Sequence, residues 1–529
     1  MSISKLFHYP KSGFVMSLAR LFEMIKFALV LPLVLCTLTF SAPAQSATGA
    51  IVPHRYLVVY RNSTIPSDAE ARAHAAGARL IQRDVHFGIT SVQSDLTEDD
   101  ATAMRLLAAQ PGVAYVLHDR IVTAQRLHIR LDPNSFSVTI GSKAGDPSPY
   151  DTFYTDTPQG WAVQQVGGYG NNVSGAPAHG PWDITEGKGV RIAIIDSGVD
   201  ENHPDIAPNL ALNLSEVDQT AYPSACDDGS PQDQAGHGTW TASLAAGAIG
   251  PGTGLTIGVA PQATILNIKV LERMPAVLNG ASLADECTQG EASGLLSWVL
   301  QGIEDAITNR ADVISLSVGT VADLSTGDGA GLLAAFNRVT AAAAQANIVL
   351  VAAAGNEGFD LDNPRYVELP AQSSGVLALV ASTNPACAQN TLSGSGCAPG
   401  PVSLAYYSNF GTPLNALSAP GGSDPEGGDQ AVSGWIRGAC SSGKPSTIDG
   451  PPTDSSHSLG CFNLGHTPYV QAMGTSASAP LAAGVAALIR GAHPDWDAAT
   501  VVAAMRSSAI VVPGLPVPEI NAAAALALP

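Results

Sequence analysis

At 529 residues the chain is long enough to bury a large core and too long to be one small domain. Charged residues make up only 13 %, whereas glycine (53) and proline (37) are frequent, which argues against a coiled coil or a disordered acidic protein and suits a compact, loop-rich enzyme. The formal net charge of -20 excludes nucleic acid as an expected partner, because its phosphate groups would be repelled.

The first 47 residues have the pattern of an export signal. Basic residues precede an apolar run from Phe27 to Phe40, and small residues follow it as far as Ala47. The run is too short for a permanent membrane anchor, and Pro32 interrupts it. We therefore predict that residues 1–47 are a signal peptide and that the protein is secreted, to the medium or to the cell surface.

Residues 48–125 have the pattern of a small α+β domain. The strands and helices predicted there are, in order, Tyr56–Tyr60, Ser67–Ala76, Gly88–Val92, Thr97–Ala109 and Val113–Leu117. An independent binding module would show the same pattern. Residues 126–160 are rich in Asp, Pro, Ser and Thr and lack periodicity, so we expect an exposed linker that is cut during processing, followed by the start of the mature chain.

From Trp182 onward, apolar runs of strand length alternate with helical patterns. The predicted strands are Val190–Ile195, Thr264–Leu271, Val313–Val318, Ile348–Ala353 and Val376–Ala381. The predicted helices are Thr239–Ala248, Glu291–Asn309, Leu332–Ala346 and Ser478–Arg490. This alternation predicts an α/β fold, a mainly parallel sheet with helices on both faces, whose active groups gather at the carboxyl ends of the strands.

Four polar residues stand at the boundaries of these elements: Asp196, His237, Asn356 and Ser476. Each of them taken alone is better explained as a cap or a turn residue. Together they supply the roles of acyl transfer, with Ser476 as the nucleophile, His237 as the base and Asp196 orienting the imidazole. The side-chain amide of Asn356 and the backbone N–H of Ser476 would stabilise the oxyanion.

The sequence around these residues resembles that of secreted subtilisin-like serine proteases. The matching motifs, in that family's order, are Asp196-Ser197-Gly198, Gly236-His237-Gly238-Thr239, Ala354-Gly355-Asn356-Glu357-Gly358 and Gly474-Thr475-Ser476. The resemblance implies a subtilisin-like catalytic domain at 161–529, an endopeptidase that acts through an acyl-enzyme, no cofactor for catalysis and a monomer. Gly112–Val116 resembles the last strand of the family's inhibitory propeptide. Residues 48–125 are therefore expected to be the intramolecular inhibitor of a self-processed zymogen.

The resemblance also implies where a protein or peptide substrate binds. One wall of the groove pairs with the substrate as an added strand, and the other lines the primary specificity pocket; the matching residues are Ser317, Val318 and Gly319, and Ala353, Ala354 and Gly355. Recognition through backbone groups predicts broad specificity. The residues after Ser476 instead resemble the kexin and furin branch, so a processing protease with a preference for basic residues is the alternative.

Two further alternatives concern the chemistry itself. A catalytically silent relative used for binding is disfavoured, because all four candidate positions are filled. A carboxylate-serine peptidase of the sedolisin type shares the Gly-Thr-Ser-Ala-Ser stretch. That branch uses a glutamate base and an aspartate at the oxyanion position, where His237 and Asn356 stand here.

The cysteines beyond the signal predict disulfides in an oxidising compartment. Several pairings are allowed; sequence proximity favours Cys387 with Cys397 and Cys440 with Cys461, which leaves Cys226 with Cys287. The Gly- and Ser-rich residues 422–467 are predicted to be an inserted loop pinned by a disulfide. A structural calcium ion is compatible with the resemblance, and Asp205 is its one matching candidate ligand.

Overall fold

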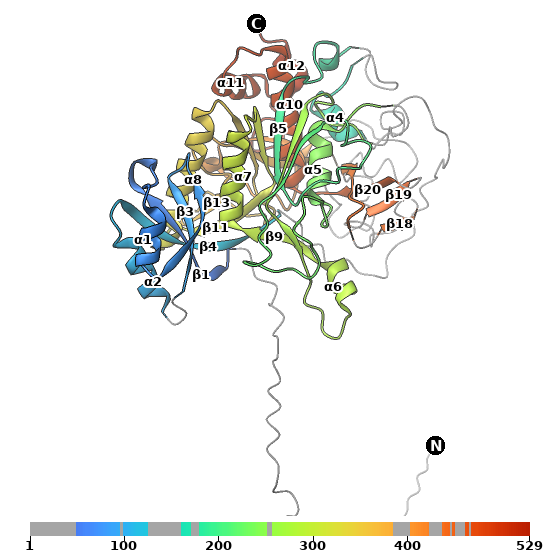
Figure 1. Ribbon diagram of the computed structural model, residues 1–529. Coiled ribbons are helices and arrows are strands. Elements are labelled where there is room, and N and C mark those ends of the chain that lie inside the picture. Colours follow the sequence, from blue (N-terminus) through green and yellow to red (C-terminus); the bar gives the residue numbers. More distant parts are fainter. Residues whose placement is uncertain are drawn as a thin grey trace, which may run out of the picture. The chain divides into compact units, whose positions relative to one another are not determined.

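Figure 1 shows the protein as a computed structural model. The structure describes residues 49–95, 99–124, 160–170, 179–250, 256–384, 402–422, 436–444, 447–449, 461–464 and 467–529. The predicted signal peptide, nearly all of the predicted linker, and Cys387 and Cys397 lie outside these residues. Every element described below belongs to one compact unit, residues 45–529.

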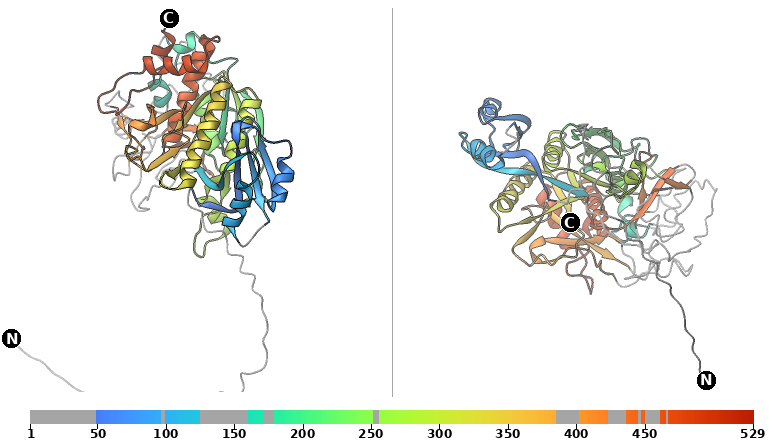
Figure 2. Two further views of the ribbon diagram at one scale, coloured as in Figure 1. Left: turned by 90° about the vertical axis from the view of Figure 1, so that its left-hand side faces the viewer. Right: turned by 90° about the horizontal axis from the view of Figure 1, so that it is seen from below.

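The N-terminal domain, residues 49–124, is an antiparallel sheet with two helices on one face (Figure 2). Its elements are β1 (Ile51–Tyr60), η2 (Arg61–Ser63), α1 (Ala69–Ala75), β2 (Ala78–Asp84), β3 (Ile89–Ser94), α2 (Asp100–Ala108) and β4 (Val113–Ala124). Along β1, Tyr56 and Val58 pack on α1 and α2, whereas Leu57 and Val59 belong to a core shared with the rest of the chain. This explains why β1 is apolar on both faces. The sequence did not predict β2, because this edge strand is partly exposed and carries polar residues.

The larger sheet is mainly parallel, as predicted, and has the strand order β15-β14-β12-β10-β5-β7-β6. Its strands are β5 (Arg191–Asp196), β6 (Leu210–Ser215), β7 (Thr264–Lys269), β10 (Val313–Leu316), β12 (Val349–Ala353), β14 (Leu377–Thr383), β15 (Ser403–Leu404) and β16 (Ala416–Pro420), which also pairs with β14. Among the described strands of this sheet, β15 alone runs antiparallel to its neighbour.

Helices cover both faces of this sheet, which confirms the predicted α/β class (Figure 1). One face carries α4 (Trp161–Gln165), η3 (Pro181–Asp183), α5 (His237–Ala246), α10 (Thr475–Ala492), α11 (Ala498–Ser508) and α12 (Ala522–Leu526). The other face carries α7 (Leu296–Thr308) and α8 (Gly327–Gln345). Side chains of β5 alternate between the two cores: Ile192 and Ile194 face α5 and α10, and Ala193 and Ile195 face α7 and α8.

The prediction of one helix over Glu291–Asn309 is wrong. Its first residues form β9 (Glu291–Leu295), which pairs with β4 and with β8 (Glu272–Met274), and α7 begins only at Leu296. A local pattern could not reveal this strand, because its partner β4 comes from the N-terminal domain. The strand predicted to end at Val318 is also divided, since β10 gives way to β11 (Val318–Asp323), which pairs with β13 (Tyr366–Leu369) and β4.

The predicted insertion at 422–467 forms part of a separate four-stranded sheet rather than a loop alone. Its strands are β17 (Ile436–Ala439), β18 (Thr447–Asp449), β19 (Cys461–Leu464) and β20 (Thr467–Ala472). A Cys440–Cys461 disulfide pins it, and a second disulfide, Cys226–Cys287, holds α6 (Leu283–Gln289); both match the favoured pairing. The remaining short element is η4 (Thr412–Leu414). Among the described residues, no helix has the length and apolar character needed to cross a membrane.

Candidate functional site

Asp196 and His237 meet at the carboxyl end of β5. Asp196 is 1 % exposed, and its Oδ1 lies 2.6 Å from Nδ1 of His237, the first residue of α5. The backbone N–H of Ser197 donates to the same oxygen (2.7 Å), and the hydroxyl of Thr241 donates to Oδ2 (3.2 Å). A carboxylate held in this way accepts the Nδ1 proton and so selects the tautomer whose Nε2 can act as a base.

A buried carboxylate that the sequence did not single out, Asp233, organises the turn that leads to His237. It accepts hydrogen bonds from the backbone N–H groups of Ala235, Gly236 and Thr239 and from the hydroxyls of Ser197 and Thr239. Burial raises the pKa of Asp233. The first turn of α5 also approaches β5 closely, because a Cβ on Gly238 would lie 2.1 Å from the carbonyl oxygen of Gly198. Glycine at 238 is what allows His237 to lie against Asp196.

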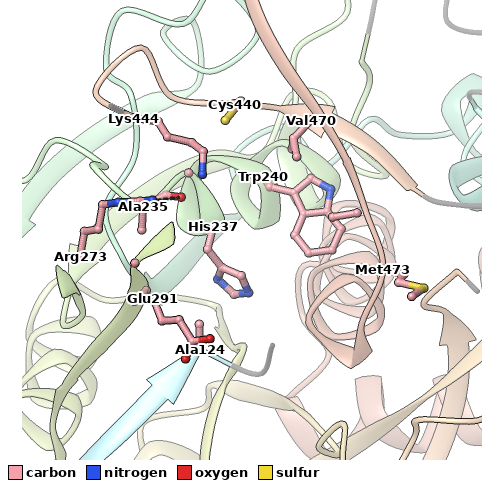
Figure 3. A pocket seen from close by; sticks show the side chains of 14 residues that line it. Ala124, Ala235, His237, Trp240, Arg273, Glu291, Cys440, Lys444, Val470 and Met473 are labelled. Carbon is pink, nitrogen blue, oxygen red and sulfur yellow. Dashed lines mark hydrogen bonds between the residues drawn. The ribbon is translucent and has the colours of Figure 1, made fainter. Parts of the chain in front are cut away.

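Ser476 is the second residue of α10 and is 1 % exposed. The hydroxyl of Ser317, which lies between β10 and β11, donates to the carbonyl oxygen of Ser476 (3.0 Å). The helix α10 packs against α5, and Met473 and His237 line one cavity (Figure 3). Ser476 therefore lies at the same end of the sheet as His237, at a helix N-terminus whose N–H groups and dipole favour negative charge.

Asn356 lies in the loop after β12 and is oriented by the residue before Ser476. Its Oδ1 accepts hydrogen bonds from the backbone N–H (2.9 Å) and the hydroxyl (2.8 Å) of Thr475. The amide is thereby fixed with its carbonyl toward Thr475 and its NH2 group on the other side. Asn356 is thus hydrogen-bonded to the residue that precedes Ser476. This bond keeps the two predicted donors to the oxyanion, the Asn356 amide and the Ser476 N–H, close together.

The loop that carries Asn356 is braced by Asn409. The Oδ1 atom of Asn409 accepts hydrogen bonds from the backbone N–H groups of Glu357 (3.2 Å) and Phe359 (2.8 Å), and its Nδ2 donates to the Glu357 carboxylate (2.7 Å). Gly355 has φ of 100°, and a Cβ there would lie 2.1 Å from Nδ2 of Asn409. Glu357, which follows Asn356 directly, is therefore a brace of this loop.

The end of β4 lies in a groove between β9 and β11. Thr123 is paired with Ser293 of β9 and with Gly319 of β11, and Ala124 is paired with Val318, all antiparallel. The segment from Ser317 to Gly319 thus has a strand paired beside it, and that strand is β4 of the same chain. Sequence reasoning missed the wall formed by β9, because residues 291–295 were assigned to a helix.

The other predicted wall residues lie next to the oxyanion loop. Ala353 is the last residue of β12, Ala354 follows it, and both are at most 1 % exposed. The backbone N–H of Ala354 donates to the carbonyl of Leu379 in β14 (3.0 Å). Strand β12 is the neighbour of β10, which leads to Ser317, so the two predicted walls start from adjacent strands.

Two buried cations hold the turn before His237 from behind. Lys269 Nζ lies 2.8 Å and 3.0 Å from the carboxylate oxygens of Asp227 and donates to the carbonyl of Gln232 (2.8 Å). Arg273 donates to the carbonyl of Thr288 after α6 (2.6 Å) and to that of Gln234 (3.4 Å). The Cys226–Cys287 disulfide joins the two segments that these cations contact. This network is not apparent from the sequence, because its members come from separate segments of the chain.

The candidate calcium ligand, Asp205, is fully buried. Its Oδ2 accepts a hydrogen bond from the hydroxyl of Tyr469 (3.2 Å) and lies 3.9 Å from Nδ1 of His203. Within the described ranges, no group of three or more His, Cys, Asp or Glu side chains is arranged to hold a metal ion. The calcium site stays a prediction.

Comparison with known proteins points to one family. Residues 187–524 match the subtilase family. Thermitase from Thermoactinomyces vulgaris is 37 % identical over 203 residues, which cover 38 % of this chain and 58 % of thermitase. The intracellular serine protease of Paenibacillus polymyxa is 30 % identical over 198 residues, 37 % of this chain and 50 % of that protein. The chain thus spans between half and two thirds of the length of these relatives. Subtilisin from Bacillus pumilus is 30 % identical over 341 residues, 64 % of this chain and 90 % of that protein.

Two solved structures share the fold. Fervidolysin from Fervidobacterium pennivorans superposes with a TM-score of 0.58 at 18 % identity, covering 92 % of this chain and 64 % of fervidolysin. The epidermin leader peptide processing serine protease from Staphylococcus aureus superposes with a TM-score of 0.57 at 18 % identity, covering 89 % of this chain and 97 % of that protein. At this level of identity the likeness concerns the fold alone.

Proposed function

Because the chain belongs to the subtilase family, we propose that it is a secreted serine endopeptidase that hydrolyses peptide bonds of proteins through an acyl-enzyme. The observation that carries the proposal is the hydrogen bond between His237 Nδ1 and Asp196 Oδ1 (2.6 Å), at the end of the sheet where Ser476 lies in the first turn of α10. Asp196, His237 and Ser476 come from three distant parts of the chain. If each had only a local structural role, they would not need to lie at the same end of the sheet.

In this proposal each of the four residues has a defined role. Ser476 Oγ attacks the carbonyl carbon of the scissile bond while Nε2 of His237 takes the hydroxyl proton. Asp196 stabilises the imidazolium that forms, and His237 then gives the proton to the leaving amine. The Asn356 amide and the Ser476 N–H donate to the oxyanion. Water then attacks the acyl carbon while His237 takes its proton, and His237 returns that proton to Ser476 Oγ as the acid is released.

We also propose that the N-terminal domain is a propeptide that inhibits its own protease until it is cut away. Support comes from β4, which enters the groove between β9 and β11 as a substrate strand would and ends at Ala124 beside His237 (Figure 3). The scissile bond of self-processing then falls shortly after Ala124. Recognition through backbone pairing supports broad specificity, and a preference for basic residues is the alternative.

A fluorophosphonate probe tests the chemistry, because it labels only an activated serine. The processed protein should be labelled at Ser476, and His237→Ala should abolish the labelling. His179→Ala is the matched control, since His179 is 85 % exposed at its side chain and should not affect it. A folded, processed protein that stays unlabelled would leave a catalytically silent binding protein as the better account.

A further inference from the structure

A cavity of about 80 Å³ adjoins both His237 and the end of β4 (Figure 3). Its volume is that of about two to three water molecules. Ala124, the last described residue of β4, contributes its methyl group to the lining, and Glu291 and Ala292 of β9 lie on the same side. The cavity therefore begins where the side chain of a substrate residue in the place of Ala124 would point.

The far wall of the cavity is built by the inserted sheet. Cys440, Lys444, Val470, Ala472 and Met473 supply it, together with Trp240 of α5. This wall is fixed in place: Trp240 Nε1 donates to the carbonyl of Ile436 (3.2 Å), and the N–H of Ala439 donates to the hydroxyl of Ser243 (2.9 Å). A preformed wall of this kind selects side chains by size.

The disulfide of the insertion also packs directly on the turn before His237. A Cβ on Gly236 would lie 3.0 Å from Sγ of Cys440 and 3.6 Å from Sγ of Cys461. The hydroxyl of Ser442 donates to the carboxylate of Asp200 (2.7 Å), which anchors the next part of the insertion. The insertion is thus a structural part of the groove and not a surface appendage.

The chemistry of the lining is mainly apolar. Trp240, Val470, Met473 and several alanines supply most of the lining. The polar side chains beside them are His237, Arg273, Glu291 and Lys444, and the guanidinium of Arg273 is engaged by the carbonyl oxygens of Cys287 and Thr288. An apolar side chain would gain by displacing water from such a space.

We propose that this cavity is a subsite for an apolar side chain of the size of leucine or methionine, carried by the substrate residue that takes the place of Ala124. The inference rests on the proposed function, since it concerns the substrate of the same site. In this account, Ala124 of the chain's own β4 leaves the subsite unfilled, so the proposed propeptide is held there by its backbone pairing and not by this side chain.

Peptides that copy residues 119–130 with position 124 varied test the subsite on the processed enzyme. Leucine and methionine at that position should raise kcat/KM about tenfold or more over alanine, because each methylene group buried in a hydrophobic pocket typically raises kcat/KM by at least about tenfold. Glycine, aspartate and lysine should be no better than alanine. Equal rates for all residues would overturn the subsite, and a preference for aspartate or lysine would overturn its apolar character.

A cavity-filling variant provides the second arm. Ala472→Leu should lower the ratio of leucine to alanine rates several-fold, and Ala344→Leu, on the exposed face of α8, is the matched control that should leave the ratio unchanged. A ratio unaffected by Ala472→Leu would contradict the assignment. If no peptide is cut and no fluorophosphonate labelling occurs, the proposed function itself fails, which is a different result from cleavage without preference.

Discussion

Asn356 is the residue whose role the geometry makes most specific. Thr475 fixes the amide carbonyl, so the NH2 group is preorganised before any oxyanion forms. Asn356→Ala should lower kcat by roughly a hundred- to a thousandfold with little change in KM, because the lost hydrogen bond acts in the transition state. Asn363→Ala, an exposed asparagine of a nearby loop, is the control. A raised KM at constant kcat would show that Asn356 binds substrate instead.

The four candidate residues, Asp196, His237, Asn356 and Ser476, could be singled out from the sequence, because each stands in a short motif at the boundary of a helix or strand. The residues that hold them could not. Asp233 looks like any acidic turn residue, and only the folded chain shows that five donors converge on its carboxylate. Thr241 and Ser317 are likewise ordinary in sequence, and tertiary contacts alone place their hydroxyls at Asp196 and at the Ser476 carbonyl.

The contact between β4 and α8 depends on a glycine. A Cβ on Gly331 would lie 2.5 Å from Cδ2 of Leu117, so this side chain of β4 packs directly on the helix backbone. Gly331→Leu should weaken inhibition by the proposed propeptide at least tenfold without affecting the active site. Gly327→Leu is the matched control, because Gly327 is in the same helix and an added Cβ there would have no atom within 4 Å.

The inhibition constant of the cleaved propeptide measures this effect. A Gly331→Leu protease that is inhibited as tightly as the parent would show that the contact with α8 contributes little. Thermal unfolding of both glycine variants checks that the catalytic domain remains folded, since an added side chain in a helix can also act through stability.

The regular elements of the parallel sheet were predictable because buried strands read as continuous apolar runs. Strand β9 was not, because Glu291–Leu295 has no alternation of its own and becomes a strand only by pairing with β4 and β8. The inserted sheet was predicted as a loop for a similar reason, since its strands are short and its stability comes from the Cys440–Cys461 disulfide and from packing on α5.

The attachment of the N-terminal domain to the rest of the protein should depend on pH. Nε2 of His118 lies 2.6 Å from Asp100, and its Nδ1 lies 3.5 Å from Asp328 of α8. The interaction of the imidazole with the Asp328 carboxylate is the main cause that raises the pKa of His118. A raised histidine pKa stabilises the contact fully below its ordinary value of about 6.5, and the contribution is lost as pH rises through the raised value.

A second group acts in the same direction. Burial raises the pKa of Asp84, which lies in the N-terminal domain near Glu304 and Asp305 of α7. A carboxyl group whose pKa is raised by burial makes the buried state less stable as pH rises above the group's ordinary pKa of about 4. Asp84 therefore also opposes attachment at higher pH.

We therefore predict that the cleaved propeptide dissociates more readily at pH 8 than at pH 5.5. The measurement is the dissociation constant of the cleaved complex across this range. His118→Gln should flatten the dependence, and His179→Ala should leave it intact. Tighter association at the higher pH would contradict the account.

Self-processing by Ser476 is tested by comparing the intact precursor with its Ser476→Ala variant. Mass spectrometry and N-terminal sequencing of the two purified chains report whether Ser476 cuts its own chain and where. We predict that the parent separates into two fragments at a bond shortly after Ala124, and that Ser476→Ala stays whole. If purified Ser476→Ala is cut at the same bond as the parent, the prediction is contradicted, because the cleavage would then not depend on Ser476.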